Sequence, residues 1–137
     1  AIPPWAPELA SLEWDWFATY THPGQTTPDD AAPRINPTLI WRTYRWRIAS
    51  WWLEDADARS PAPEEGEEAM LIYRHASDLS VHVVPSNERL LLAMKIISEA
   101  LDPEVLGSIP GGNRALYEEV LSEARSLSVL VGRPGSP

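Results

Sequence analysis

The chain has 137 residues, a formal net charge of -9 and no cysteine. This length is typical of one domain, or of one domain with an arm. The absence of cysteine excludes disulfides and thiolate metal sites. The negative charge argues against nucleic-acid binding, because phosphate contacts need clustered Lys and Arg side chains. No apolar run resembles a membrane span or a signal peptide, so we expect a soluble, cytoplasmic protein with no membrane partner.

The aromatic residues are concentrated in the first half of the chain. All seven tryptophans fall there: Trp5, Trp14, Trp16, Trp41, Trp46, Trp51 and Trp52. Protein interfaces are enriched in Trp, Tyr and Arg side chains. Two interpretations are equally open. Either most of these rings fill the core of a small domain, or part of them forms a docking surface for a protein partner.

Residues 1–37 are predicted to form an N-terminal helix and a Pro-rich linker. Apolar residues at helical spacing predict the helix over residues 5–20: Trp5, Leu9, Leu12, Trp16 and Tyr20. Pro23 and Gly24 end the helix, and prolines recur through residues 21–37. Glu13 lies in the aromatic part of this helix. It is either a partly buried carboxylate paired with an Arg or a solvated side chain.

Residues 38–131 are predicted to form the main domain, beginning with strands. Aromatic and β-branched residues favour a strand over 38–47, with a helix capped by Asn36 as the competing interpretation. A short helix over 48–57 and an acidic loop over 60–68 follow. Two β-rich runs, 70–74 and 79–84, are predicted to pair as a hairpin across 76–78. Alternation places the apolar Leu79, Val81 and Val83 on one face of the second strand, and Ser80 and His82 on the other.

Two helices complete the predicted domain. The first begins at a Ser86 cap and carries an apolar stripe of Leu90, Met94, Ile97 and Leu101. The second is capped by Asn113 and carries Leu116, Val120, Ala124 and Leu127 on one face. Residues 132–137 are predicted to be a disordered tail. This order of elements predicts an α+β fold, a small antiparallel sheet with helices at one side, and it also describes winged-helix-like domains.

The sequence contains no recognisable catalytic or metal-binding motif. His22, His75 and His82 are the only histidines, and they lack the spacing of a metal motif. His75 and His82 could approach each other across the hairpin, which leaves a small enzyme or metal binder as a minor hypothesis. No nucleophile, base and orienting group come together in the sequence, so we expect a binding module without catalytic residues.

Several phrases, in order, resemble the second domain of HvfC-type proteins. They are Pro7-Glu8-Leu9-Ala10-Ser11-Leu12-Glu13-Trp14, Asn36-Pro37, an aromatic strand, Trp51-Trp52, Met70-Leu71-Ile72-Tyr73-Arg74 and Leu90-Leu91-Leu92. In architecture the chain resembles the MbnC-type partner subunits of methanobactin biosynthesis. The resemblance covers residues 5–101. HvfC-type proteins usually carry a further helical domain in front, which favours the shorter methanobactin type.

The resemblance implies a non-catalytic subunit of an oxidase heterodimer. Its partner would be a TIM-barrel, multinuclear iron-dependent oxidase. The pair would modify Cys residues of a ribosomally made precursor peptide into the oxazolone and thioamide groups that bind copper. The iron belongs to the barrel subunit, so no metal or other cofactor is expected in this chain. A winged-helix-like element would bind the leader peptide as an added strand, with candidate contacts at Leu79, Ser80, Val81, His82, Val83, Arg89 and Leu92.

Composition adds a candidate docking surface for the oxidase, made of Glu13, Trp14, Trp41 and Trp46. A short, protected sheet edge that binds nothing is an equally open interpretation of the peptide-binding strand. The alternative function is a winged-helix-like DNA-binding regulator. It is disfavoured because the last helix offers Arg114 and Arg125 against three glutamates: Glu118, Glu119 and Glu123.

Overall fold

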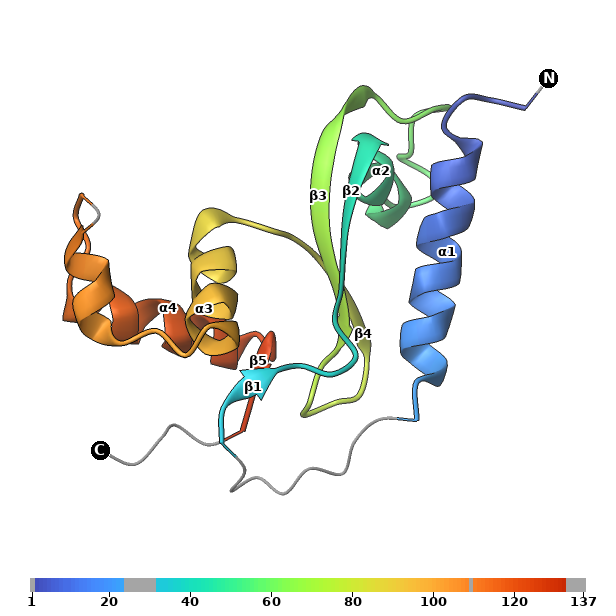
Figure 1. Ribbon diagram of the computed structural model, residues 1–137. Helices are drawn as coiled ribbons and strands as arrows, with labels where there is room; N and C mark the ends of the chain where they lie inside the picture. Colours follow the sequence, from blue (N-terminus) through green and yellow to red (C-terminus); the bar gives the residue numbers. More distant parts are fainter. Residues whose placement is uncertain (1, 24–31, 109, 133–137) are drawn as a thin grey trace.

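A computed structural model of the chain describes residues 2–23, 32–108 and 110–132. The fold is α+β with an N-terminal helix, as the sequence predicted (Figure 1). The helices and strands, in chain order, are α1 (Ala6–Thr21), β1 (Arg34–Ile35), β2 (Ile40–Trp46), α2 (Ile48–Leu53), β3 (Glu65–Arg74), β4 (Val81–Pro85), α3 (Glu88–Ser98), the 3-10 helix η1 (Pro103–Ser108), α4 (Arg114–Ser126) and β5 (Leu130–Val131). Among the described residues, no helix combines the length and the apolar character that crossing a membrane requires.

The strands form two antiparallel sheets. The larger sheet has the order β2-β3-β4, and its register aligns Ile40 with Ile72 and Ile72 with Val83. A β-bulge interrupts the β2–β3 pairing between Tyr44 and Trp46. The smaller sheet pairs β1 with β5, two segments from opposite ends of the chain. The strand predicted over 38–47 and the predicted hairpin are both confirmed.

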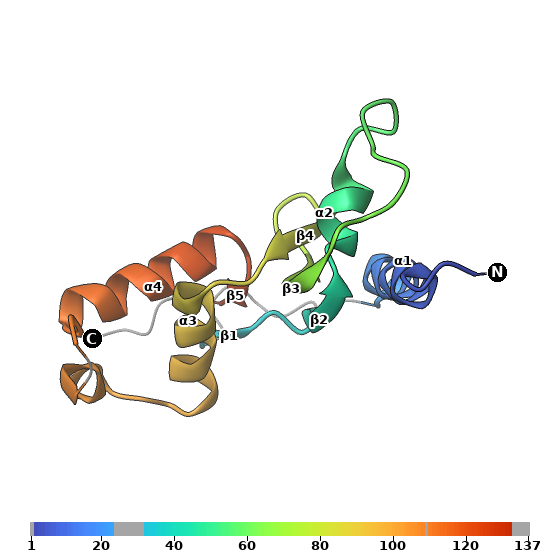
Figure 2. The ribbon, with the colours of Figure 1, turned by 90° about the horizontal axis from the view of Figure 1, so that it is seen from above.

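The larger sheet is covered on both faces, because successive strand residues alternate between them. One face packs under α1 and α2, and its buried cluster consists of Leu12, Tyr44, Ile48, Ala49, Met70 and Ile72. The other face packs against α3 and α4 through Leu71, Tyr73, Leu90, Ala93, Val120 and Ala124, among others. Figures 1 and 2 show α1 on one side of the sheet and α3 and α4 on the other. The expectation of helices at one side only was therefore wrong.

Strand β3 is longer than predicted, and helix α2 is shorter. β3 begins at Glu65, inside the predicted acidic loop, and α2 ends at Leu53. The Glu68 carboxylate accepts hydrogen bonds from the backbone N–H groups of Ala49 (2.8 Å) and Ser50. A carboxylate at a helix N-terminus accepts hydrogen bonds from N–H groups that have no partner within the helix, and its negative charge interacts favourably with the positive end of the helix dipole. The acidic segment therefore belongs to β3, where it pairs with β2 and where Glu68 caps α2.

The N-caps of the last two helices are both asparagines. Asn113 Oδ1 accepts a hydrogen bond from the N–H of Leu116 (2.9 Å), as predicted. The predicted Ser86 cap of α3 was wrong by one residue. Asn87 Oδ1 accepts instead from the N–H of Leu90 (2.8 Å). Both asparagines have the extended backbone that an N-cap requires.

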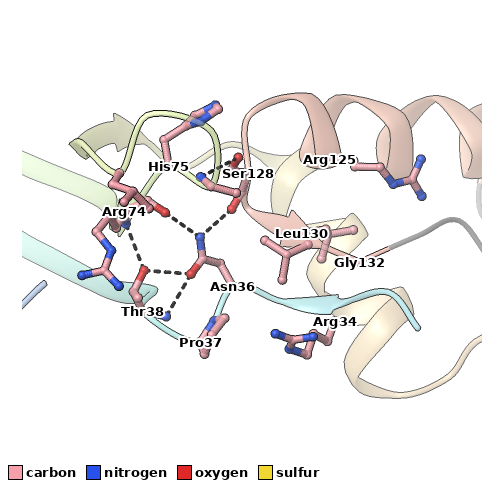
Figure 3. A pocket seen from close by; sticks show the side chains of 13 residues that line it. Arg34, Asn36, Pro37, Thr38, Arg74, His75, Arg125, Ser128, Leu130 and Gly132 are labelled. Carbon is pink, nitrogen blue, oxygen red and sulfur yellow. Dashed lines mark hydrogen bonds between the residues drawn. The ribbon is translucent and has the colours of Figure 1, made fainter. Parts of the chain in front are cut away.

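Asn36 links three segments that are distant in sequence (Figure 3). Its amide nitrogen donates to the carbonyls of Arg74 (2.9 Å) and Ser128 (2.8 Å). Its side-chain oxygen accepts from the backbone N–H and the hydroxyl of Thr38. Asn36 therefore does not cap a helix, and the competing helix interpretation of 38–47 was wrong. Strand β1 and Asn36 lie in the predicted linker, while residues 24–31 of that linker and 133–137 of the predicted tail lie outside the described residues.

Candidate functional site

Strand β4 forms one edge of the larger sheet, where we predicted peptide binding. Backbone hydrogen bonds from His75 to Ser80 and from Ser86 to Ala69 fix which β4 residues pair with β3. Since antiparallel pairs alternate, His82 and Val84 bond to β3, and the N–H and C=O groups of Val81 and Val83 face away from it. Within residues 2–23, 32–108 and 110–132, no backbone group of a turn or loop bonds to those four groups.

Edge strand β2 is less open than β4. The Glu8 carboxylate from α1 accepts hydrogen bonds from the backbone N–H groups of Arg45 (2.7 Å) and Trp46 (2.9 Å). A side chain that satisfies edge N–H groups blocks further strand pairing there. Of the two edges of the sheet, β4 is therefore better suited to accept an additional strand.

Two of the predicted peptide contacts lie in the turn before β4 rather than in the strand. Leu79 is 63% exposed and adopts a positive φ of 61°. Ser80 is held by Asp78, whose carboxylate accepts from both the N–H (2.9 Å) and the hydroxyl (2.7 Å) of Ser80. These hydrogen bonds lower the pKa of Asp78. The assignment of Leu79 and Ser80 to the strand was wrong, because β4 begins at Val81 and the polar turn sets the conformation of both residues.

His82 lies on β4 and its ring stacks on Tyr73, with centroids 5.7 Å apart. The His75 ring is 4.9 Å from that of His82, so the predicted approach of the two histidines across the hairpin is confirmed. Nε2 of His82 is 3.0 Å from the Ser80 hydroxyl. Across the described ranges, no three His, Cys, Asp or Glu side chains are grouped to hold a metal ion.

Arg89 and Leu92 on α3 have other roles in the structure. Arg89 donates to Glu123 (2.9 and 2.8 Å) and Glu119 (3.2 Å) of α4. These bonds raise the pKa of Arg89 and lower that of Glu123. Leu92 is half-buried against the core that α3 shares with α4. The structure thus brings Val81, His82 and Val83 together, and it places Arg89 in a bridge between helices.

The exposed aromatic residues lie mainly on α1. Trp14 is 69% exposed, and its ring lies 6.2 Å from that of Phe17. Phe17 and Tyr20 are also exposed, as is Glu13. We call Glu13, Trp14, Phe17 and Tyr20 the aromatic face of α1. Since Glu13 is exposed, the hypothesis that it is a partly buried carboxylate was wrong.

The seven tryptophans divide into two groups. Trp14 and Trp41 are exposed, and Trp41 lies on β2. The other five, including the predicted docking residue Trp46, are half-buried. Four of these five pack between α1 and α2, where Trp5 contacts Trp51 and Trp16 contacts Trp52. Of the seven tryptophans, only Trp14 and Trp41 therefore expose more than half of their surface.

The buried carboxylate of α1 is Asp15, which the sequence analysis missed. Its side chain accepts two hydrogen bonds from Arg42 of β2, at 2.7 Å to Nε and 3.1 Å to Nη2. The hydrogen bond to Asp15 raises the pKa of Arg42. Asp15 shares a helix face with the buried Leu12 and Thr19, and that spacing of three and four residues was a usable signal.

No protein-family model matches the chain. No curated protein matches it either. Over the part of the chain that the structure describes, the fold and the geometry define an α+β domain with an open sheet edge at β4 and an exposed aromatic face on α1.

Proposed function

We propose that this chain is a non-catalytic, cytoplasmic subunit that binds a precursor peptide and docks a larger enzyme. The observation that carries the proposal is the open edge of β4, with the backbone groups of Val81 and Val83 directed away from the sheet. An extended peptide adds to such an edge through main-chain hydrogen bonds, and side-chain contacts give it specificity. Leu79, exposed at one end of the edge, offers an apolar contact.

The aromatic face of α1 supports the docking part of the proposal. Trp14, Phe17 and Tyr20 are each more than half exposed on a single helix. Aromatic side chains are frequent anchors of protein interfaces, because they bury a large area at low entropic cost. The partner that the sequence resemblance implies is a TIM-barrel, iron-dependent oxidase, and the peptide is a Cys-containing precursor that the pair converts to oxazolone and thioamide groups. We also propose that β3, β4 and α3 together act as a winged-helix-like element that recognises the leader part of this peptide.

A proline at Val83 tests the peptide edge. Val83→Pro removes one outward N–H group and leaves the β3-facing hydrogen bonds of β4 in place. We expect the variant to bind the Cys-containing precursor peptide with a dissociation constant at least about tenfold higher than that of the wild type, measured by isothermal titration calorimetry.

Val83→Ala is the matched control, since it shortens the side chain and keeps the backbone N–H. We expect it to bind the peptide nearly as well as the wild type. Circular dichroism of both variants separates loss of binding from loss of folding. If Val83→Pro folds and binds the peptide normally, the peptide does not add to β4. If the full chain stays monomeric beside both the barrel oxidase and the peptide, the whole proposal fails.

A further inference from the structure

A separate cavity of about 320 Å³ lies where three connections meet (Figure 3). Its walls come from β1 and the turn after it, from the β3–β4 turn, and from the end of α4 with β5. The charged and titratable lining residues are Arg34, Arg74, His75 and Arg125. The described part of its wall contains no Asp or Glu. A volume of this size is within the range of small-molecule sites.

The charge of this cavity is opposite to that of the whole chain. Three of the eleven Lys and Arg residues line it, in a protein with a formal net charge of -9. Arg74 is anchored, because its guanidinium donates to the backbone carbonyl of His22 (2.7 Å). Nε of Arg125 is buried and has no hydrogen-bond partner among the described residues. A buried donor without a partner is costly, and an acceptor bound in the cavity that Arg125 lines would remove this cost.

The walls of the cavity are held in an unusual backbone conformation. Three described non-glycine residues have positive φ, and two of them, Leu79 (61°) and Ser128 (64°), line this cavity. Ser128 takes this conformation because it ends α4, where its N–H donates to the carbonyl of Arg125 (3.0 Å). Asn36 binds the carbonyl of Ser128, and the Ser128 hydroxyl accepts from the N–H of Ala76 (3.2 Å). These bonds fix the two turns relative to each other before any ligand arrives.

We propose that this cavity binds the oxyanion group, carboxylate or phosphate, of a small molecule. Guanidinium groups match the planar geometry of such oxyanions and bind them through charge-assisted hydrogen bonds. Arg125 of α4 supplies the charged N–H donor, and Arg34 and the anchored Arg74 on the other walls add to the local positive potential. Ligand binding there bridges the β3–β4 turn and the β1–β5 sheet.

An NMR titration of the full ¹⁵N-labelled chain tests the site, with inorganic phosphate and succinate as probes. Sodium chloride at matched ionic strength serves as the reference. We expect saturable shifts around Ala76, Ser128 and Gly132 with a dissociation constant of roughly 1 mM or lower. The probe that binds more tightly identifies the group as phosphate or carboxylate.

Arg125→Gln is expected to weaken binding by about tenfold. Arg114→Gln is the matched control, because Arg114 is exposed on the same helix and lies outside the cavity. If Arg125→Gln does not fold, Arg34→Gln on β1 tests the same prediction, because it also lowers the positive charge of the cavity and should weaken binding. Shifts that stay linear for both probes, or that fall equally in Arg125→Gln and Arg114→Gln, overturn the proposal.

Discussion

Asp15 of α1 and Arg42 of β2 form a two-point ion pair, in which the carboxylate is buried and the guanidinium is half exposed. This pair fixes the N-terminal helix onto the edge strand of the sheet. We expect Asp15→Ala to lower the free energy of unfolding by roughly 2 kcal/mol, because it leaves a charged donor without its partner. Urea denaturation measures the change. Glu13→Ala, two residues away and exposed, is the control and should change stability by less than about 0.5 kcal/mol.

Tyr44 makes stability depend on alkaline pH. Burial is the main cause that raises its pKa to about 12, against an ordinary value of 10.0. The unfolded chain therefore loses this proton first. The protonated Tyr44 hydroxyl therefore contributes its full share to the free energy of unfolding below the pKa of the unfolded chain. This contribution is lost as the pH rises from about 10 through about 12.

In Tyr44→Phe, the free energy of unfolding should fall less between pH 10 and pH 12 than in the wild type, as measured by denaturation curves at a series of pH values. The Tyr44 hydroxyl has no hydrogen-bond partner among the described residues. At neutral pH the substitution should therefore be neutral or stabilising. A large destabilisation of Tyr44→Phe at neutral pH would mean that the hydroxyl does have a partner.

Asn36 should be among the least replaceable polar residues. Its side chain makes four hydrogen bonds in a buried position. We expect Asn36→Ala to cost roughly 3 kcal/mol, since it leaves two backbone carbonyls without their donor. Thermal unfolding followed by circular dichroism checks this. Thr43→Ala, at an exposed site on β2, provides the reference, and equal melting temperatures would contradict the linking role of Asn36.

The cap of α3 can be tested with neighbouring substitutions. Asn87→Ala removes the side-chain acceptor for the Leu90 N–H and should cost about 1 kcal/mol. Ser86→Ala should have little effect, because the Ser86 side chain does not cap this helix. Urea denaturation measures both changes. If Ser86→Ala destabilises the protein more than Asn87→Ala, Ser86 is the N-cap of α3, as the sequence predicted.

Trp14 and Trp41 should matter for partner binding more than for folding. Both side chains are mostly exposed, so replacing either by Ala should change stability by less than about 1 kcal/mol. If the aromatic face of α1 docks the oxidase, Trp14→Ala should weaken their association by about tenfold or more.

Trp16→Ala is the contrasting variant, because Trp16 stacks on Tyr20 and contacts Trp52. It should lose roughly 2 kcal/mol of stability. Analytical ultracentrifugation with the barrel oxidase measures the association of each variant. A Trp14→Ala variant that is folded and binds the oxidase normally would exclude the aromatic face from the interface.

Local sequence patterns predicted most of the elements of this fold. The helix over 5–20, the strand over 38–47, the hairpin and the Asn113 cap each depend on residues close together in the chain. Helical period, alternation and capping act over a few residues, so they can be recognised without knowing the tertiary structure. The same local information predicted an edge strand over 79–84, although the Asp78 turn shortens it at Leu79 and Ser80.

Only the tertiary structure decided which polar residues hold the elements together. Asn36 bonds to a carbonyl 92 residues away, Asp15 to an arginine 27 residues away, and Glu68 to the start of α2. Such partners come from other elements and leave no periodic signal at either position. The exposure of Trp14 and Trp41, against the half-buried positions of the other tryptophans, was decided in the same way. The sequence by itself determined the main α+β elements and their order, because their patterns are local. The pairing of β1 with β5, the aromatic face of α1 and the arginine-lined cavity depend on packing between distant segments.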